Sequence, residues 1–259
     1  MTPLRVTFLG TATSSGLPVI GCDCRTCTSR DPRNTRFRAS VLMQWNGRNV
    51  VVDTGPEFRL QMVRAGVRHL DAILMTHEHA DHIYGMDDVR LFTEKTGEDM
   101  PVFSSARTAS AIRRAFPYIF EPLKVPGTTK PALHLHDLDG PFSLFGRTIH
   151  PLYVLHGHMP ISAFRIGDFA YVTDCSYIPP ETEAALKGLD TLVLGALRHA
   201  PHPTHFTLQE AVDAAQRIAP RRTYFTHIGH HLEHEETNAL LPEGMALAYD
   251  GLVLDVGGQ

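Results

Sequence analysis

Thr76-His77-Glu78-His79-Ala80-Asp81-His82 is the stretch that decides the fold of this chain, because it places three imidazoles and the carboxylate of Asp81 within six consecutive residues. The segment before it, residues 70–75, is mostly apolar and predicts a buried strand. In an extended backbone the side chains of His77 and His79 point the same way, whereas the Asp-His pair comes after a turn. This division indicates two metal ions side by side, an arrangement that activates water and stabilises an oxyanion.

Size and composition fit one folded domain covering residues 1–259. The chain has 259 residues, of which 43% are hydrophobic, as expected of an ordinary globular core. Its apolar runs are too short for a transmembrane helix, and the N-terminus lacks the apolar region of a signal peptide, so we expect a cytoplasmic location and no membrane partner. The net charge of −4 argues against long nucleic acid as a partner, although a local basic patch at Arg33, Arg36 and Arg38 stays open as a site for it.

Strand patterns dominate both halves of the chain, with helical patterns between them. Asn46-Gly47 lies between two strand patterns and predicts a hairpin. The expected strands are residues 5–10, 41–45, 49–53, 71–75, 148–155, 162–166, 169–173, 192–197, 222–226 and 251–256. The expected helices are residues 58–65, 87–93, 108–116 and 208–218, the last capped by Thr207; residues 93–100 are expected to be a loop, and 127–131 a turn. The pattern predicts two sheets covered by helices.

Three later residues also follow strands directly and carry metal-binding groups, namely His156, Asp174 and His227. Each is weak alone, because an aspartate after a strand is commonly a turn residue and histidine is frequent in this chain. His158 lies as near to the end of its strand as His156 does. Combined with the opening motif, these positions form a set of ligands that is typical of a two-metal site.

In their order these motifs resemble the metallo-β-lactamase superfamily over nearly the whole chain. The resemblance implies an αββα four-layer sandwich with a dinuclear centre at one edge of the sheets. It also implies that Asp53 orients the histidine motif without binding metal. By the same resemblance, the register of the strand that contains Phe164-Arg165 favours His156 over His158 as the metal ligand. One metal would be held by His77, His79 and His156, the other by Asp81, His82 and His227, with Asp174 between the two. Such ligands accept zinc or manganese, and also iron or nickel.

Three cysteines in the loop at residues 21–28, Cys22, Cys24 and Cys27, form a second cluster. With no secretion signal, this spacing indicates a metal rather than disulfides. A tetrahedral zinc site needs a fourth ligand, for which His230 and His231 are better candidates than Cys175. Cys175 follows Asp174 directly, so we expect it to face into the sheet as a buried free thiol.

The cysteine spacing, together with Gly-Thr-x-x-x-x-Gly-x-Pro at residues 10–18, is similar to the PhnP branch of this superfamily. Members of that branch are phosphodiesterases that act on a phosphoribosyl cyclic phosphate. The resemblance implies a structural zinc bound by the three cysteines and His230. It also assigns the role of a general acid to the second histidine of His-Pro-x-His, which is His205 rather than His202. Two prolines stiffen the loop that carries both.

The sequence therefore predicts a metal-dependent phosphodiesterase that hydrolyses a cyclic phosphodiester of a small sugar phosphate or nucleotide. Asp81 and His205 are the expected catalytic residues, Asp81 orienting or accepting a proton while it binds metal. A tRNA 3′-processing endonuclease is an alternative, but it would need a basic surface and a tRNA-binding arm. A thioesterase or lactonase on the same fold, or a non-catalytic metal sensor, stays open, as does a homodimer.

Overall fold

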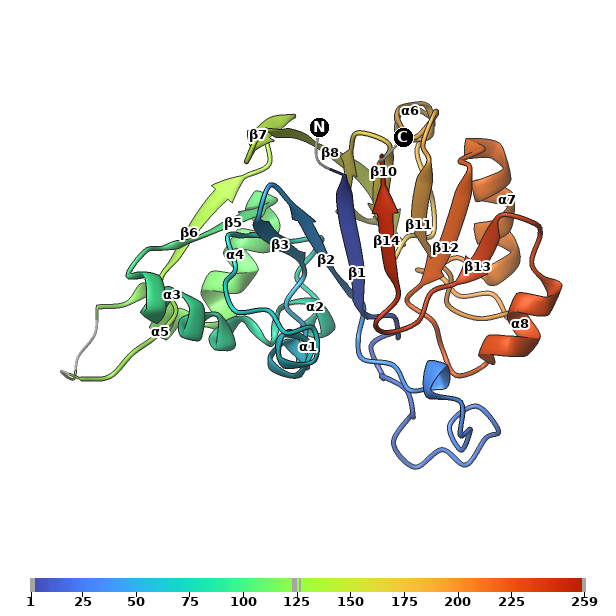
Figure 1. Ribbon diagram of the computed structural model, residues 1–259, viewed down its shortest axis with the longest axis horizontal. Helices are drawn as coiled ribbons and strands as arrows, with labels where there is room; N and C mark the ends of the chain where they lie inside the picture. Colours follow the sequence, from blue (N-terminus) through green and yellow to red (C-terminus); the bar gives the residue numbers. More distant parts are fainter. Residues whose placement is uncertain (1–2, 123–124, 126, 258–259) are drawn as a thin grey trace.

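The computed structural model describes residues 3–122, 125 and 127–257 of the chain. In these residues two sheets of seven strands pack against each other, and helices cover their outer faces (Figure 1). The predicted αββα sandwich is thereby confirmed.

The first sheet has the strand order β14-β1-β2-β3-β4-β5-β6. Its antiparallel part consists of β14 (Val253–Val256), β1 (Leu4–Gly10), β2 (Ser40–Trp45) and β3 (Arg48–Val52). Its parallel part continues from β3 through β4 (Ala72–Leu74), β5 (Met100–Ser104) and β6 (Leu133–Asp137). Because β3 and β4 are parallel neighbours, the residues that follow them, Asp53 and the histidine motif, lie at the same edge.

The second sheet has the order β13-β12-β11-β10-β9-β8-β7. Its strands are β7 (Phe142–Leu144), β8 (Arg147–His156), β9 (Met159–Ile166), β10 (Phe169–Val172), β11 (Thr191–Gly195), β12 (Arg222–Thr226) and β13 (Met245–Leu247). The strands β10 to β13 run parallel to one another, so the segments after β10 and β12 also meet at one edge. Each of these segments carries one of the expected ligands.

Three apolar clusters hold the layers together. Val6, Phe164 and Tyr171 belong to the cluster between the sheets, and Phe58 and Val212 belong to clusters beneath the outer helices. The helices beside the first sheet are α1 (Phe58–Arg64), α2 (Ala80–Ile83), α3 (Arg90–Thr96), α4 (Ala106–Ala115) and α5 (Pro117–Phe120). Those beside the second are α6 (Pro180–Ala185), α7 (Leu208–Ile218) and α8 (His234–Leu240). Two 3-10 turns, η1 (Pro32–Asn34) and η2 (Met86–Val89), complete the elements.

Local sequence signals predicted several features correctly. Asn46 and Gly47 both have positive φ, 51° and 73°, as a two-residue type I′ hairpin requires. Thr207 caps α7 and forms a reciprocal capping box with Glu210. The predicted loop at residues 93–100 is wrong in its first half, because α3 continues to Thr96 and ends at left-handed Gly97. Helices α2, α5, α6 and α8 and strands β5, β6, β7 and β13 were missed, since each is too short for a clear hydrophobic period.

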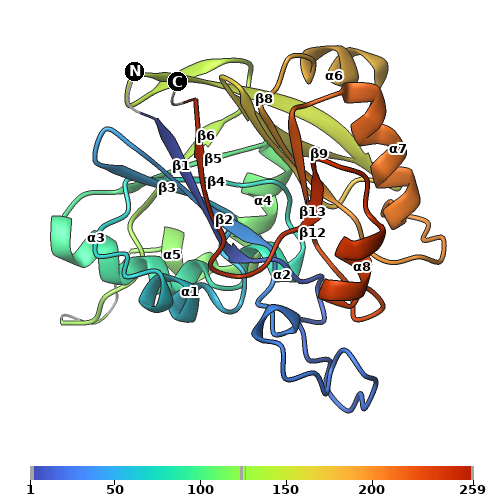
Figure 2. The same cartoon turned by 45° about the vertical axis from the view of Figure 1, so that its right-hand side comes forward.

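The loop that carries the three cysteines projects from the sandwich next to α8 (Figure 2). The two ends of the described chain lie together at the opposite end of the sheets (Figure 1). Backbone bonds tie the base of this loop to the segment after β12, since Thr13 donates to Ile228 and Ile228 donates to Thr11. The cysteine loop is thus attached to the strand end that supplies His227.

Candidate metal centre

Three of the expected site residues have left-handed backbone conformations at strand ends. The φ angles of Asp53, Asp174 and His227 are 64°, 55° and 57°, following β3, β10 and β12. This conformation costs an L-residue about 1–2 kcal/mol, so the surrounding contacts must hold it in place. Such strain is concentrated at the edge where the sheets bring their polar side chains together.

Asp53 is fully buried and fixes the histidine motif from behind. Its carboxylate accepts hydrogen bonds from the Thr76 backbone N–H at 2.8 Å and from the Thr76 hydroxyl at 2.7 Å, and lies 2.7 Å from His82 Nδ1. Burial raises the pKa of Asp53, and the contacts with His82 and Thr76 oppose that shift. Because Nδ1 of His82 is engaged by Asp53, the other ring nitrogen, Nε2, is the one directed into the centre.

His77, His79 and His156 form the first group of ligands, with their nearest nitrogen atoms within 4.8 Å of one another. Nε2 of His77 lies 3.0 Å from Nδ1 of His79. His156 comes from the end of β8, and its Nδ1 lies 2.8 Å from the carbonyl oxygen of Thr204, which leaves Nε2 for a metal. Zinc–nitrogen bonds of about 2.0–2.1 Å require nitrogens about 3.3 Å apart, so the group fits a metal ion with modest adjustment.

Asp81, His82, Asp174 and His227 form the second group, and all four are buried. His82 Nε2 lies 3.3 Å from an oxygen of Asp81 and 3.5 Å from one of Asp174. His227 Nε2 lies 2.9 Å from the other oxygen of Asp174. Asp174 also belongs to a group with His156, so its carboxylate lies between the two sets, where a bridging ligand would be placed.

The electrostatics of the second group favour a cation. Burial opposes charge on each of these side chains, yet the mutual attraction is larger. The two imidazoles hold the pKa of Asp174 well below its usual value, and the pKa of His227 is raised to about 9 by Asp174 and Asp81. Nε2 of both His82 and His227 is buried without a hydrogen-bond partner among the described residues. Orphaned nitrogens beside two carboxylates fit divalent metal ions.

His205 reaches the centre from the segment between β11 and α7. Its ring stacks on that of His227 at 4.8 Å between centroids, and its Nδ1 lies 3.9 Å from Asp174. Burial, followed by the neighbouring His227, lowers the pKa of His205 to about 3, so the ring is neutral near pH 7. His202 lies beside it at 5.0 Å, whereas His158 is exposed and belongs to none of the ligand groups formed by the described residues.

The three cysteines of the projecting loop converge on His230. Nδ1 of His230 lies 3.2, 3.6 and 3.7 Å from the sulfur atoms of Cys22, Cys24 and Cys27. Zinc bonds of about 2.3 Å to sulfur and 2.1 Å to nitrogen give a tetrahedral edge of about 3.6 Å, so this donor set fits one zinc ion. Cys175 is buried with a free thiol in the core of the second sheet, as predicted.

Sequence reasoning missed the residues that set the position of α2. The ideal Cβ of an alanine at Gly55 would lie 2.3 Å from the backbone oxygen of Asp81, and one at Gly85 would lie 2.2 Å from the oxygen of Gly55. The backbone N–H of Thr54 donates to the carbonyl of His82 at 2.7 Å. Asp53-Thr54-Gly55 directly after a strand is the one signal that could have identified this contact.

Comparison with known proteins defines the class. Residues 48–228 match the family described as Beta-lactamase superfamily domain, so the chain belongs to this superfamily. The crystal structure of a new diphosphatase from the PhnP family superposes with a TM-score of 0.92 and 44% identity, covering 98% of this chain and 97% of that one. The chain is therefore a PhnP-like protein with the metallo-β-lactamase fold that hydrolases of this superfamily share.

More distant relatives carry other names. Zn(2+)-bound PqqB from Methylobacterium extorquens shares the fold, with a TM-score of 0.78 and 19% identity over 97% of this chain and all of that one. An octanoyltransferase from Porphyromonas gingivalis is 36% identical over 254 residues, which cover 96% of this chain and 51% of the relative. The chain thus spans about half the length of that relative. A ribonuclease Z from Agathobacter rectalis matches 48% of the chain and 41% of its own length at 26% identity.

No helix in the described part of the chain is both long and apolar enough to cross a membrane.

Proposed function

We propose that the protein is a metal-dependent phosphodiesterase that hydrolyses a cyclic phosphodiester of a small sugar phosphate or nucleotide. The observation that carries the proposal is the juxtaposition of two adjoining ligand groups, which meet at Asp174, with His205 packed against them. The 44% identity to a PhnP-family diphosphatase supports a phosphorus centre over a carbon one. The single domain, cytoplasmic location, zinc or manganese centre and small-molecule partner are part of the same proposal.

Each side chain has a separate task in this scheme. His77, His79 and His156 would hold one metal, and Asp81, His82 and His227 the other, with Asp174 shared and Asp53 orienting His82. Divalent ions bound there lower the pKa of water to supply a hydroxide nucleophile and neutralise charge on phosphoryl oxygens. Asp81 would be both a ligand of the second metal and the group that orients the attacking water.

His205 assists the leaving group. A neutral imidazole next to a bound phosphodiester anion takes a proton from solvent more readily, because the negative charge opposes the lowering of its pKa by burial and His227. The protonated ring then donates its proton to the departing sugar oxygen. Its stacking on His227 and the two prolines of its loop keep it within reach of the phosphorus centre.

A structural zinc is part of the proposal as well, with Cys22, Cys24, Cys27 and His230 as ligands. It would join the projecting loop to the turn after β12, three residues beyond His227. Binding there contributes to folding, because the ligands come together only in the folded chain.

Hydrolysis of a diphosphate is a second candidate, favoured by the diphosphatase name of the relative that covers 98% of the chain. The two reactions differ at the leaving group. A phosphate leaves readily without a proton, whereas a sugar hydroxyl needs one, so dependence on His205 distinguishes them. The sequence match to the ribonuclease Z of Agathobacter rectalis covers under half of the chain at 26% identity and carries less support.

A substrate panel tests the proposal. We expect the zinc- or manganese-loaded protein to hydrolyse bis(p-nitrophenyl) phosphate and a 2′,3′-cyclic nucleotide, and a dinucleoside diphosphate if the second candidate is right. A lactone and a thioester complete the panel. Activity confined to those two carbon esters would overturn the phosphodiesterase, and activity on none of them by the fully metal-loaded protein would favour a sensor.

A further inference from the structure

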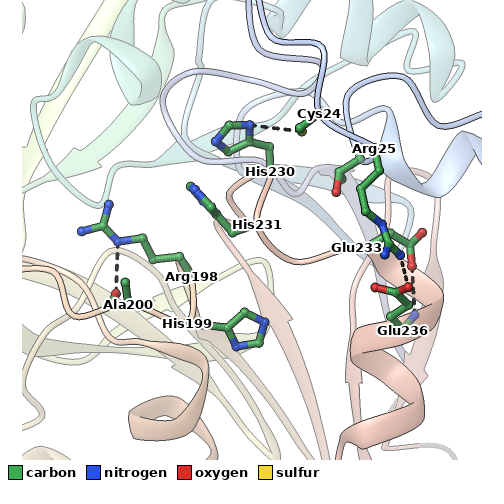
Figure 3. A pocket seen from close by; sticks show the side chains of 10 residues that line it. Cys24, Arg25, Arg198, His199, Ala200, His230, His231, Glu233 and Glu236 are labelled. Atoms are coloured by element: carbon green, nitrogen blue, oxygen red, sulfur yellow. Dashed lines mark hydrogen bonds and ion pairs between the residues drawn. The ribbon is translucent and has the colours of Figure 1, made fainter.

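A cavity beside the cysteine loop is lined by Cys24 and His230 of the expected zinc site, and by none of the ligands of the two-metal centre. It has a volume of about 490 Å³ and opens between the cysteine loop, the segment after β11, the turn after β12 and the start of α8 (Figure 3). We propose that this cavity binds a phosphoryl group, held by Arg198, His199 and His231. The site shares no residue with the two-metal centre.

The basic wall of the cavity is free to bind an anion. His199 and His231 are exposed, and neither ring has a hydrogen-bond partner among the residues that the structure describes. Arg198 is held in place, since its Nε donates to the carbonyl of Ala200 at 3.1 Å and its Nη2 to that of Pro201 at 2.7 Å. A guanidinium that is already immobilised loses little entropy when its remaining N–H groups bind a phosphoryl oxygen.

The acidic groups of the same cavity are already engaged. Glu236 forms an ion pair with Arg25. Glu233 caps α8 by accepting from the Glu236 backbone N–H at 2.9 Å, and it accepts from the Asn34 amide at 2.5 Å. Figure 3 shows these carboxylates on the side opposite Arg198, with the His199 ring between them and Cys24 on a third side. An anion bound by Arg198 would therefore lie on the far side of the cavity from the carboxylates.

The position of the cavity connects it to the catalytic segments. Arg198 and His199 begin the segment that ends in His205, and His231 ends the turn that begins at His227. Gly229 donates to the carbonyl of Leu197 at 2.9 Å, so the two segments are already joined by backbone at this place. An anion that bridges Arg198 and His231 would hold the segments of both catalytic-centre histidines in one arrangement.

Arg68 and His69 provide a matched comparison elsewhere on the surface. They are also consecutive, exposed and at the wall of a cavity, which here has a volume of about 370 Å³. His69 Nε2, however, lies 3.5 Å from the carboxylate of Asp71 and 3.1 Å from the amide of Asn49. The pair Arg68 and His69 thus matches Arg198 and His199 in residue type but has no free imidazole. The variant Arg68→Gln/His69→Gln is therefore a control for general loss of surface charge.

Titration with inorganic phosphate, followed by calorimetry, tests the proposal without turnover. Asp174→Asn removes phosphate binding at the metal centre, and in this background we expect one remaining site. Adding Arg198→Gln/His199→Gln should weaken that site by about tenfold or more, since charged hydrogen bonds to phosphate are lost. The Arg68→Gln/His69→Gln control should leave it unchanged. Unaltered binding in the cavity variant, or equal losses in both variants, would refute the proposal.

Two further measurements complete the design. Arg198→Lys retains the charge and should recover part of the binding, which guards against a variant that fails to fold. Comparing KM for bis(p-nitrophenyl) phosphate and for a 2′,3′-cyclic nucleotide with a 5′-phosphate identifies the source of the anion. If only the second KM rises in Arg198→Gln/His199→Gln, the cavity holds the substrate's own distal phosphate. If neither rises while phosphate binding is lost, its ligand is free phosphate.

Discussion

Replacing Gly55 with alanine should weaken metal binding at a distance from the ligands themselves. The added Cβ would lie 2.3 Å from the backbone oxygen of Asp81. Carbon–oxygen contacts of this kind are normally about 3.3 Å, so the two segments must separate by about 1 Å. The neighbouring Gly85 blocks a compensating shift, because it already lies against the oxygen of Gly55. The movement therefore falls on α2, which carries both Asp81 and His82.

A shift of about 1 Å is large for a metal site, where ligand distances hold within about 0.2 Å. We expect Gly55→Ala to lower the affinity for the metal at Asp81 and His82 by about 10–100-fold, the range found when supporting contacts of ligands are lost. Overpacking should also cost about 1–3 kcal/mol of stability. Metal content after dialysis against graded chelator, with stability from denaturant unfolding, measures the two effects separately.

Gly66→Ala is the matched control. Its Cβ would meet nothing within 4 Å, but its φ of +66° strains any side chain. It should therefore lose about 1 kcal/mol of stability through the backbone and keep full metal affinity. If Gly55→Ala retained two active-site metals as firmly as Gly66→Ala, close packing at Gly55 would not be what positions Asp81.

Three further predictions address the zinc, the leaving group and pH. Cys24→Ser should lose about one zinc per chain and retain two other metals by elemental analysis; a variant that kept all three would disprove the structural site. His205→Gln should lower kcat on a cyclic phosphodiester by about 10²–10⁴, with a much smaller effect on a diphosphate, and equal effects on both would contradict its role with the leaving group. Burial raises the pKa of Asp250 to about 6 in the folded state, above its unfolded value near 3.9. The folded state thus binds the extra proton, so this group contributes stability below pH 4 that is lost as pH rises through 6. Denaturant unfolding at pH 4 and pH 7 should show a smaller pH-dependent loss in Asp250→Asn than in the native chain; an unchanged difference would show that Asp250 does not titrate in this way.

The sequence predicted the parts of this molecule in which one local signal determines one local structure. The hairpin at Asn46-Gly47 and the cap at Thr207 are of this kind, since turn and cap geometry depend on the residue itself. The ligand order was recognisable because parallel strands bring their carboxyl ends to one edge, which makes strand-end residues neighbours. The short elements β5, β6 and α5 gave no such signal, because their place is decided by packing against strands distant in sequence.

Positions within the site were beyond sequence reasoning for a different reason. The carbonyl of Thr204 that contacts His156, and the glycine at 55 that admits Asp81, act through backbone atoms. Backbone contacts carry no residue type of their own, so a sequence records them only where a side chain would obstruct them, as at Gly55. Thr204 contacts His156 through its carbonyl, which any residue would supply, so the sequence gives no sign of this contact.

The left-handed conformations of Asp53, Asp174 and His227 connect the fold to its chemistry. At about 1–2 kcal/mol each, they lower the free energy of unfolding by a sizeable fraction of that of a typical domain. Hydrophobic packing does not require these conformations. They bring a carboxylate, a second carboxylate and an imidazole back over the ends of β3, β10 and β12. Asp174, Asp81 and Asp53 raise the pKa of His82, and Asp174 and Asp81 raise that of His227, so negative charge gathers around both imidazoles. Divalent metal bound here would neutralise that charge, so the ions that the proposed reaction needs would also stabilise the edge at which it occurs.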